Sequence, residues 1–550
     1  MDNQRLILFA ALSIVIMMLF SAWQEQHAPK QAPMTETAQQ AESSVPSAAE
    51  MPPAVVAEPK AVPSQAPVAA VAGQHITVKT DLLDVEINTV GGEISRAALP
   101  AYPVSLKTPD VPFQLLDDRL PALFIAQSGL VAGEGMSAPD HQAVFQADQT
   151  RYQLAGGKDE LKVRLHWHSP SGIDVLKTYT FHRNSYVIDL DFQVSNTGDQ
   201  LWKGRPYRQL QRTKVAESGQ SKFIYTYMGG VFSSQWNSYQ KVKFEDMATW
   251  KPEQSYTTGG WAAMIQHYFL AAWIPDADEA NHFYTKALPD GRYLIGLSGA
   301  EKSAAPGQST QFHSRLYVGP KDQQRLEKVA PHLRLSVDYG VLDILAKPVF
   351  WLLQKIHGLV GNWGLAIILV TVIIKLVFFK LSEASYRSMA NMRRLSPKLQ
   401  ALKERYGDDR QKMSQAMMDI YKKEKINPLG GCLPILVQIP VFISLYWVLL
   451  ESVELRQAPF ILWIHDLAAK DPYYVLPLLM GASMFLQQKL NPPPMDPLQA
   501  KVLQFLPLIF TAFFAFFPSG LVLYWVVNNI LSITQQWYIT RKIEGQAAKA

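Results

Sequence analysis

Hydrophobic and polar positions change their spacing several times along the chain, and the first change lies near the N-terminus. A single apolar run extends from Leu6 to Trp23, after a short head that contains Arg5. The length of this run lies between that of a signal peptide and that of a spanning helix. No small-residue cleavage site follows it, so we predict an uncleaved transmembrane signal anchor over 1–23, with cleavage as the alternative.

A tether is predicted next, over 24–74. Between 24 and 73 the chain holds eight prolines and thirteen alanines, with almost no aromatic residues. Such a segment cannot bury enough apolar surface to offset the entropy lost on ordering, so we expect it to be disordered.

Alternation of apolar and polar residues marks the next segment, 75–335. The stretches 83–87, 161–167 and 188–194 each place an apolar residue at every second position. Turn residues such as Gly91-Gly92 separate stretches of this kind. The pattern predicts a large antiparallel β-sandwich domain, which is long enough to hold its own hydrophobic core.

Apolar residues then recur at steps of three and four, which predicts an amphipathic helix over 336–360 lying on the membrane surface. They are Leu342, Leu345, Val349, Leu352, Ile356 and Leu359. Pro348 interrupts the pattern, so the helix either kinks or begins at that residue. The alternative is a helix that packs on the β domain.

The last third of the chain contains five long apolar runs. They cover 363–381, 432–450, 473–486, 502–517 and 521–540. With the N-terminal anchor they predict six transmembrane helices, five of which form a core: the second over 361–382 and the others within 428–540. The predicted fold class is therefore an α-helical polytopic membrane protein with a large all-β sandwich domain.

The distribution of charge orients these helices. The loop 383–427 has eleven Lys or Arg against six Asp or Glu, whereas residues 24–350 have 30 against 34. Positive residues favour the cytoplasmic side, so we predict that this loop and a tail over 541–550 are cytoplasmic. The net charge of +5 thus arises between apolar runs rather than on one soluble domain, and we expect no sequence-specific nucleic-acid partner.

The basic loop 383–427 has a helical period of its own. Its apolar residues step by three and four on both sides of Gly407-Asp408-Asp409, which predicts an antiparallel helical hairpin in the cytoplasm. Its methionines could bind varied apolar partners or only join the two helices. The candidate basic residues of the hairpin are Arg393, Arg394, Lys398, Lys403 and Arg405.

Signatures of catalysis and of cofactor binding are scarce. The single Cys432 excludes an intrachain disulfide and a paired-cysteine metal site. No phosphate-binding loop, metalloprotease motif or serine-hydrolase motif is present, so we predict no cofactor and no catalytic site. His166 and His168 share one face of a strand, but without a third ligand a surface strand is favoured over a metal site.

Lys375 is the most informative charge, because it is the thirteenth residue of the run 363–381. A charge at the centre of a spanning helix costs roughly 2.5–3.5 kcal/mol on insertion scales, so such residues usually face a polar cavity or a partner. The alternative is that the side chain reaches the inner interface, although Lys380 already occupies that level. We predict that Lys375 is the positive charge of a groove open to the cytoplasm.

Polar residues of the neighbouring runs support this groove, because the predicted orientation places them in the inner leaflet or near the midplane. They are Thr371, Gln438, Gln504, Asn528, Asn529, Ser532 and Gln535. Each could instead bond to a neighbouring helix. The outer half is apolar, as in 513–517, so no polar path crosses the membrane and a channel is disfavoured.

Several short stretches in the last 200 or so residues are highly specific together. They are Gly361-Asn362-Trp363-Gly364, Asn427-Pro428-Leu429-Gly430-Gly431-Cys432, Glu454-Leu455-Arg456-Gln457-Ala458-Pro459-Phe460, Trp463-Ile464-His465-Asp466-Leu467 and Phe517-Pro518-Ser519-Gly520-Leu521-Val522-Leu523-Tyr524-Trp525. In these stretches the chain resembles the YidC/Oxa/Alb family of membrane protein insertases in its Gram-negative form. The tether and the β domain match that form by layout.

The resemblance implies an insertase and chaperone of the bacterial inner membrane, not an enzyme. It implies substrates that are nascent and newly made membrane proteins, and as partners the ribosome, the Sec translocon, its accessory SecDF complex and the lipid bilayer. It aligns the family's groove charge, usually Arg, with Lys375, and a polar groove position with Thr371. It aligns substrate-contacting positions with Ile439, Phe442, Tyr524 and Trp525.

Two residues depart from the family pattern. Lysine at 375 lacks the planar fork of arginine, and Trp525 replaces a commoner tyrosine. The family's external domain resembles sugar-mutarotase β-sandwiches, but we find no catalytic set for that chemistry. A membrane-anchored periplasmic carbohydrate-active enzyme and a transporter or channel remain as alternatives.

Overall fold

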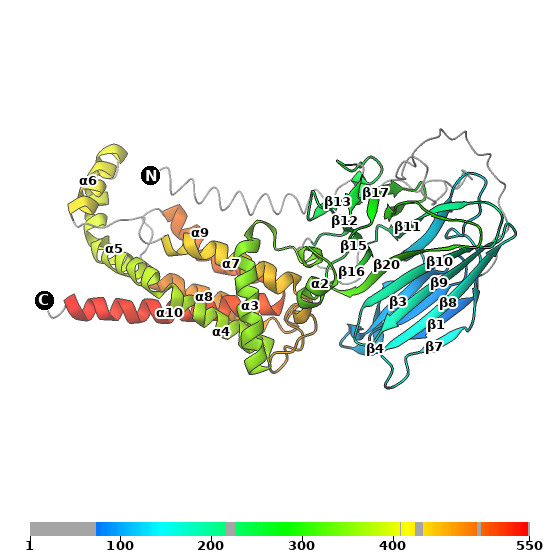
Figure 1. Cartoon of the computed structure of the whole chain (residues 1–550). Helices are drawn as coiled ribbons and strands as arrows, with labels where there is room; N and C mark the ends of the chain where they lie inside the picture. Colours follow the sequence, from blue (N-terminus) through cyan, green and yellow to red (C-terminus); the bar gives the residue numbers. More distant parts are fainter. Residues whose placement is uncertain are drawn as a thin grey trace. The chain divides into compact units, whose positions relative to one another are not determined.

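The structure is a computed structural model that describes residues 73–215, 226–254, 256–406, 409–423, 433–491 and 497–547. The described residues fall into two compact units, a β domain that ends at Val337 and a helical unit that begins at Asp338 (Figure 1). The signal anchor predicted over 1–23, and the tether over 24–74 apart from its last two residues, lie outside the described residues.

Two facing sheets build the β domain. The first has the order β14 (Thr257–Thr258), β17 (Ala280–Ala287), β18 (Arg292–Ser298), β11 (Trp202–Thr213), β5 (Phe124–Ala132), β3 (Glu93–Ser105), β2 (Asp84–Asn88), β1 (His75–Lys79) and β7 (Arg151–Gln153), with β19 (Lys302–Ala304) on β11 and β4 (Thr108–Leu116) on β3. The second has the order β13 (Gln240–Val242), β12 (Gly229–Ser233), β15 (Trp261–Ile265), β16 (Phe269–Pro275), β20 (Ser309–Pro320), β10 (Val187–Asn196), β9 (Ile173–His182), β8 (Glu160–Ser169) and β6 (Gln146–Ala147). A short helix, α2 (Gln323–Val329), follows β20.

Alternation of apolar and polar residues is visible in the sequence only for strands that bury one face. In β10 the apolar residues 188, 190, 192 and 194 are buried, while the polar residues between them are half-buried. In β16 all seven residues are buried, so its sequence has no alternation to detect. A strand covered on both faces has a continuous apolar run instead.

One buried cation connects the two sheets. Lys177 on β9 is fully buried, and its Nζ donates to the carbonyl oxygens of Gly91 at 2.9 Å and Ser128 at 3.3 Å. The same ammonium lies 5.1 Å from the ring centroid of Phe192. These contacts offset only part of the cost of burial, which lowers the pKa of the Lys177 ammonium from 10.5 to about 7.

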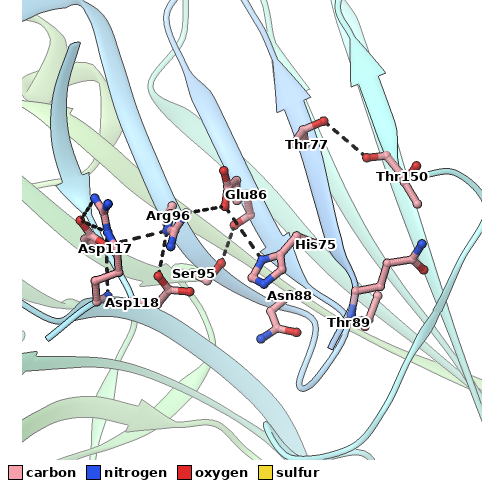
Figure 2. Close-up of polar contacts among 12 residues, drawn as sticks. His75, Thr77, Glu86, Asn88, Thr89, Ser95, Arg96, Asp117, Asp118 and Thr150 are labelled. Carbon is pink, nitrogen blue, oxygen red and sulfur yellow. Dashed lines mark hydrogen bonds and ion pairs between the residues drawn. The ribbon is translucent and has the colours of Figure 1, made fainter. Parts of the chain in front are cut away.

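A network of ion pairs lies on strands β1, β2 and β3 of the first sheet. Figure 2 shows Arg96 on β3, whose Nε lies 2.8 Å from the Asp118 carboxylate and whose guanidinium also lies 3.2 Å from Glu86 on β2. His75 on β1 approaches Glu86 at 3.9 Å. These side chains are partly exposed at the surface, and ion pairs of this kind contribute little to stability.

The helical unit contains α3 (Asp343–Val360), α4 (Trp363–Val377), α5 (Phe379–Tyr406), α6 (Arg410–Lys423), α7 (Leu433–Glu451), α8 (Val475–Leu490), α9 (Pro497–Phe514) and α10 (Ser519–Ala547). Helix α10 packs on α4, α5 and α8, while α9 packs on α8. By length and mean hydropathy, no single helix in the described part of the chain qualifies as a membrane span. Helix α4 with the first half of α5 qualifies as a pair bent by 67°.

Helix α3 differs from the sequence pattern in its buried face. It begins at Asp343 and continues through Pro348, so Pro348 does not start it. Its buried residues are Ala346, Phe350, Leu353 and Ile356, so three of the four lie one residue after the predicted apolar stripe and only Ile356 belongs to it. Of the other stripe residues, Leu342, Val349 and Leu352 are half-buried, while Leu345 is 38% and Leu359 is 86% exposed. The helix therefore has apolar residues on two sides.

The boundary between the predicted second span and the predicted hairpin lies earlier in the chain than expected. The apolar run 363–381 breaks at Phe378, so its last residues belong to α5 rather than to α4. Helices α5 and α6 then pack through a small cluster in which Leu395, Leu399 and Met417 are buried. Met417 is 9% exposed and joins the two helices, whereas Met418 is 54% exposed and points away from the cluster.

Candidate functional site

The site is built around Lys375, which α4 carries into a buried position. Asn362 caps this helix, since its side chain accepts a hydrogen bond from the Leu365 N–H at 3.0 Å. Lys375 is only 5% exposed, and its Nζ donates to Ser532 Oγ on α10 at 2.8 Å and to Gln438 Oε1 on α7 at 3.4 Å. Three helices that are distant in sequence therefore meet at one ammonium.

Both hydrogen-bond partners of Lys375 are uncharged. Ser532 donates its own hydroxyl hydrogen to the Asn528 carbonyl at 2.7 Å, which leaves its oxygen free to accept from the ammonium. Neutral dipoles stabilise the ammonium without cancelling its charge. Within the described contacts the site is thus a buried cation that retains its attraction for an anion.

The seven polar residues singled out by sequence do not form one cluster. Gln438, Asn528 and Ser532 lie at or next to Lys375, and Thr371 is buried one turn away but donates to the Ile367 carbonyl of its own helix at 2.7 Å. Asn529 faces α8 instead, where its Nδ2 donates to Ser483 Oγ at 3.0 Å.

The other two polar residues are placed differently again. Gln504 on α9 has an exposed side chain. Gln535 has a buried Oε1 without a partner in the described part of the chain. The polar residues grouped by sequence therefore have different surroundings, and on α10 itself Ser532 meets Lys375 while Asn529 meets α8.

A second polar seam between α8 and α10 was missed by the sequence analysis. Gln536 is buried, and its Nε2 donates to the Leu490 carbonyl at 3.2 Å and to Asn491 Oδ1 at 3.1 Å. With Asn529 and Ser483 it joins the C-terminal half of α8 to α10. Gln536 lies seven residues after Asn529, so a search for a second helical stripe would have found it.

The four predicted substrate-contacting residues belong to an aromatic region on α7 and α10. Phe442 lies 4.5 Å from the Trp525 ring, edge to face, and 5.6 Å from the Tyr524 ring. Tyr524 is buried, while Ile439 is 42% exposed. Phe514 of α9 adds a ring 4.7 Å from Trp525, so aromatic side chains fill the space between α7, α9 and α10.

The basic side chains of the hairpin lie on its surface where they are described. Arg394, Lys398 and Arg405 are exposed, and the Arg405 guanidinium lies 5.5 Å from the Tyr406 ring centroid. The side chains of Arg393 and Lys403 lie outside the described set.

The two histidines of β8 each form a hydrogen bond with a carboxylate. His166 Nε2 lies 3.1 Å from Asp148 and His168 Nδ1 lies 2.6 Å from Asp174, beside a depression of about 570 Å³ on the β domain. A search of the described residues found no group of three or more His, Cys, Asp or Glu placed to hold a metal ion.

Comparison with known proteins covers nearly the whole chain. Residues 75–352 match the family model described as YidC periplasmic domain, and residues 355–547 match the model described as 60Kd inner membrane protein. The membrane protein insertase YidC of Thioalkalivibrio sulfidiphilus is 52% identical over 562 residues, which cover 100% of both chains. That of Nitrosococcus oceani is 54% identical and covers 99% of this chain and 100% of its own.

A solved structure described as an active YidC insertase with its first transmembrane domain resolved is 16% identical in sequence. It covers 85% of this chain and 95% of its own, with a TM-score of 0.38.

Proposed function

The chain belongs to the YidC membrane protein insertases of the Gram-negative type, and we propose which of its residues carry out insertion. The family, the fold class, the insertase function and the inner-membrane location expected from the sequence are thereby confirmed. The protein is an insertase and not an enzyme, its large β domain is periplasmic, and its substrates are membrane proteins.

We propose that Lys375 receives the acidic groups of a substrate's polar tail. The observation that carries this proposal is the burial of its ammonium between two neutral acceptors, Ser532 and Gln438. A carboxylate entering the groove would form a charge-assisted hydrogen bond, roughly twice as strong as a neutral one. Its attraction would offset part of the free energy needed to move a charged tail out of water.

The apolar segment of the substrate follows a different path in this proposal. Ile439 and Phe442 on α7 and Trp525 on α10 offer it an apolar and aromatic surface next to the groove. Towards the outer end, Phe513, Phe514 and Phe517 pack against one another with ring centroids 4.8 to 5.5 Å apart. In this proposal the packed rings close the groove on the periplasmic side, and the tail is held only until the apolar segment moves into lipid.

The remaining partners follow from the family and from surface charge. We propose that the exposed Arg394, Lys398 and Arg405 of the hairpin approach the ribosome, whose RNA attracts cations, as it delivers a nascent chain. The Sec translocon and its accessory SecDF complex are proposed partners for larger substrates.

We also propose a layout in the membrane. Residues 1–23 form the first span, α4 with the first turns of α5 forms the second, and α3 lies at the interface.

Substitution of Lys375 tests the proposal. The full-length chain in proteoliposomes is given a single-span substrate with two acidic residues in its tail, and a matched substrate in which both are amides. We expect Lys375→Gln to lower insertion of the acidic substrate roughly tenfold, the order expected for one lost charge-assisted bond. Lys375→Glu should abolish it and Lys375→Arg should retain it. Protease protection of the tail measures insertion, and normal insertion of the acidic substrate by Lys375→Glu would refute the proposal.

A further inference from the structure

The loop between α7 and α8 contacts the first residues of α4. The Asn362 side chain, which caps α4, donates from Nδ2 to the Phe460 carbonyl of this loop at 2.9 Å. The Phe460 ring lies directly on Gly364, where a β-carbon would come within 2.0 Å of the ring. The start of α4 is therefore held against the loop by a hydrogen bond and by a close contact that requires glycine.

The same loop also holds the first residues of α10. The Ser519 N–H donates to the Ala469 carbonyl at 2.7 Å, and the buried Ser519 hydroxyl donates to the Asp466 carbonyl at 2.8 Å. The Gly520 N–H donates to the Leu467 carbonyl at 2.9 Å. Three hydrogen bonds thus fix the beginning of α10 to a stretch of four loop residues.

Asp466 connects these two attachment points. Its carboxylate Oδ1 accepts hydrogen bonds from the Gln457 N–H at 3.0 Å and the Ala468 N–H at 2.8 Å. The Leu467 N–H donates to the Ala458 carbonyl at 3.0 Å, which closes the loop beside Phe460. Gln457 has a φ of 58°, a conformation that a non-glycine residue keeps only when its surroundings hold it.

The geometry of the two helices makes this attachment important for the groove. Both α4 and α10 begin at the loop and pack against each other, and Lys375 is the thirteenth residue of one while Ser532 is the fourteenth of the other. At about 1.5 Å per residue, both side chains lie about 18–20 Å from the loop. A shift of one residue would move a side chain by about 1.5 Å and turn it by about 100°, enough to break a 2.8 Å contact.

We propose that Asp466 is a positioning residue for the groove: by closing the loop it sets the register of α4 against α10 and so places Lys375 beside Ser532. The inference rests on the proposed function of Lys375 and assigns the outer-loop motifs a role in it. Asp466 does not itself contact the substrate in this account. It acts through Phe460 and Asn362 on one side and through Ser519 on the other.

The test uses the acidic and the neutral substrates described above, with the full-length chain in proteoliposomes. We expect Asp466→Leu to lower the ratio of acidic to neutral insertion by roughly tenfold, the same order as Lys375→Gln, because a displaced Lys375 loses its charge-assisted bond to the acidic tail. Asp466→Asn should restore most of the ratio, because its amide oxygen can accept the same two N–H groups. Ser519→Ala, which removes only one hydrogen bond, should lower the ratio less.

The matched control is Asp471→Asn in the same loop. Its carboxylate accepts from Trp463 Nε1 at 3.0 Å and from the Leu476 N–H of α8 at 2.7 Å, so it should affect both substrates equally. An equal loss of both substrates in Asp466→Leu, or in Ser519→Ala if the first variant does not assemble, would overturn the inference. If Lys375→Gln leaves the ratio unchanged, the proposed function fails, whatever the Asp466 variants do.

Discussion

A lysine ammonium has three N–H donors, and Lys375 directs two of them to Ser532 and Gln438. In the described contacts the third donor remains for a substrate group. Lysine also presents its charge at one point, whereas arginine offers a planar fork that binds a carboxylate through two hydrogen bonds. If Lys375 receives acidic groups as we propose, it holds them through one point of charge and so less firmly than an arginine would.

Gly364 illustrates a residue that is required for its lack of a side chain. A β-carbon there would lie within 2.0 Å of the Phe460 ring, whereas one at Gly358 in α3 would meet no atom within 4 Å. We expect Gly364→Ala to destabilise the helical unit by about 1–3 kcal/mol through overpacking. Gly358→Ala should be neutral or slightly stabilising, since alanine favours helix. Thermal unfolding of the purified full-length chain measures both, and equal unfolding temperatures would contradict this reading.

Glu93 gives the β domain a dependence on pH. Burial raises its pKa from 4.5 to about 7, against the opposing effects of the Gln127 hydrogen bond and of Lys177. The folded domain therefore binds the Glu93 proton more tightly than the unfolded chain does. The stability that this tighter binding adds to the folded domain is fully present below pH 4.5 and is lost as the pH rises to about 7. Relative to Glu93→Gln, the natural domain should lose stability across that window.

Hydrogen exchange of β5 and β9 in the full-length chain can follow this effect. The control is Glu160→Gln on β8, at an exposed position. Parallel pH profiles for the natural chain and Glu93→Gln would show that the buried carboxyl is not the cause.

At the scale of elements, α10 is notable because it presents polar residues to two different neighbours. Ser532 faces Lys375 of α4, while Asn529 and Gln536 bond to Ser483 and to the end of α8. Hydrogen bonds between helices in membranes stabilise by about 0.6 kcal/mol on average. Such bonds join α10 to α8 on one side and to α4 on the other.

The hairpin of α5 and α6 offers a matched pair of adjacent methionines. Met417 is buried between α5 and α6, while Met418 is exposed. We expect Met417→Ala to destabilise the hairpin by about 2 kcal/mol, at the low end for buried methionines because the cluster is small. Met418→Ala should have little effect on it. Limited proteolysis within 390–423 measures the difference, and similar cleavage rates would show that Met417 does not join the two helices.

At the scale of the whole molecule, the Lys375 site and the β domain belong to different compact units. Lys375, Gln438 and Ser532 all lie in the helical unit, which begins at Asp338. We expect a chain lacking 75–337, with the tether joined to Asp338, to insert the acidic single-span substrate within roughly twofold of the full chain, since separate domains have separate cores. Loss of insertion by a truncated chain that still reaches the membrane would give the β domain a direct part in the reaction.

Much of this architecture could be predicted from the sequence, because periods and charge are properties of the chain itself. The alternation at 188–194 follows from one buried face of β10, and the basic loop 383–427 carries its charge wherever it folds. Strand β16 shows the limit of this reasoning. It is buried on both faces, and a continuous apolar run carries no period.

The sequence by itself determined the kinds of segment, their order and the isolated charge at Lys375. Tertiary structure alone decided which residues surround that charge. Lys375 and Ser532 are 157 residues apart, and their contact depends on the register of two helices that start at the same loop. A helical period shows which residues share a face, but not which neighbour that face meets. Packing between distant helices makes that choice, and here it divided the polar residues of α10 between α4 and α8.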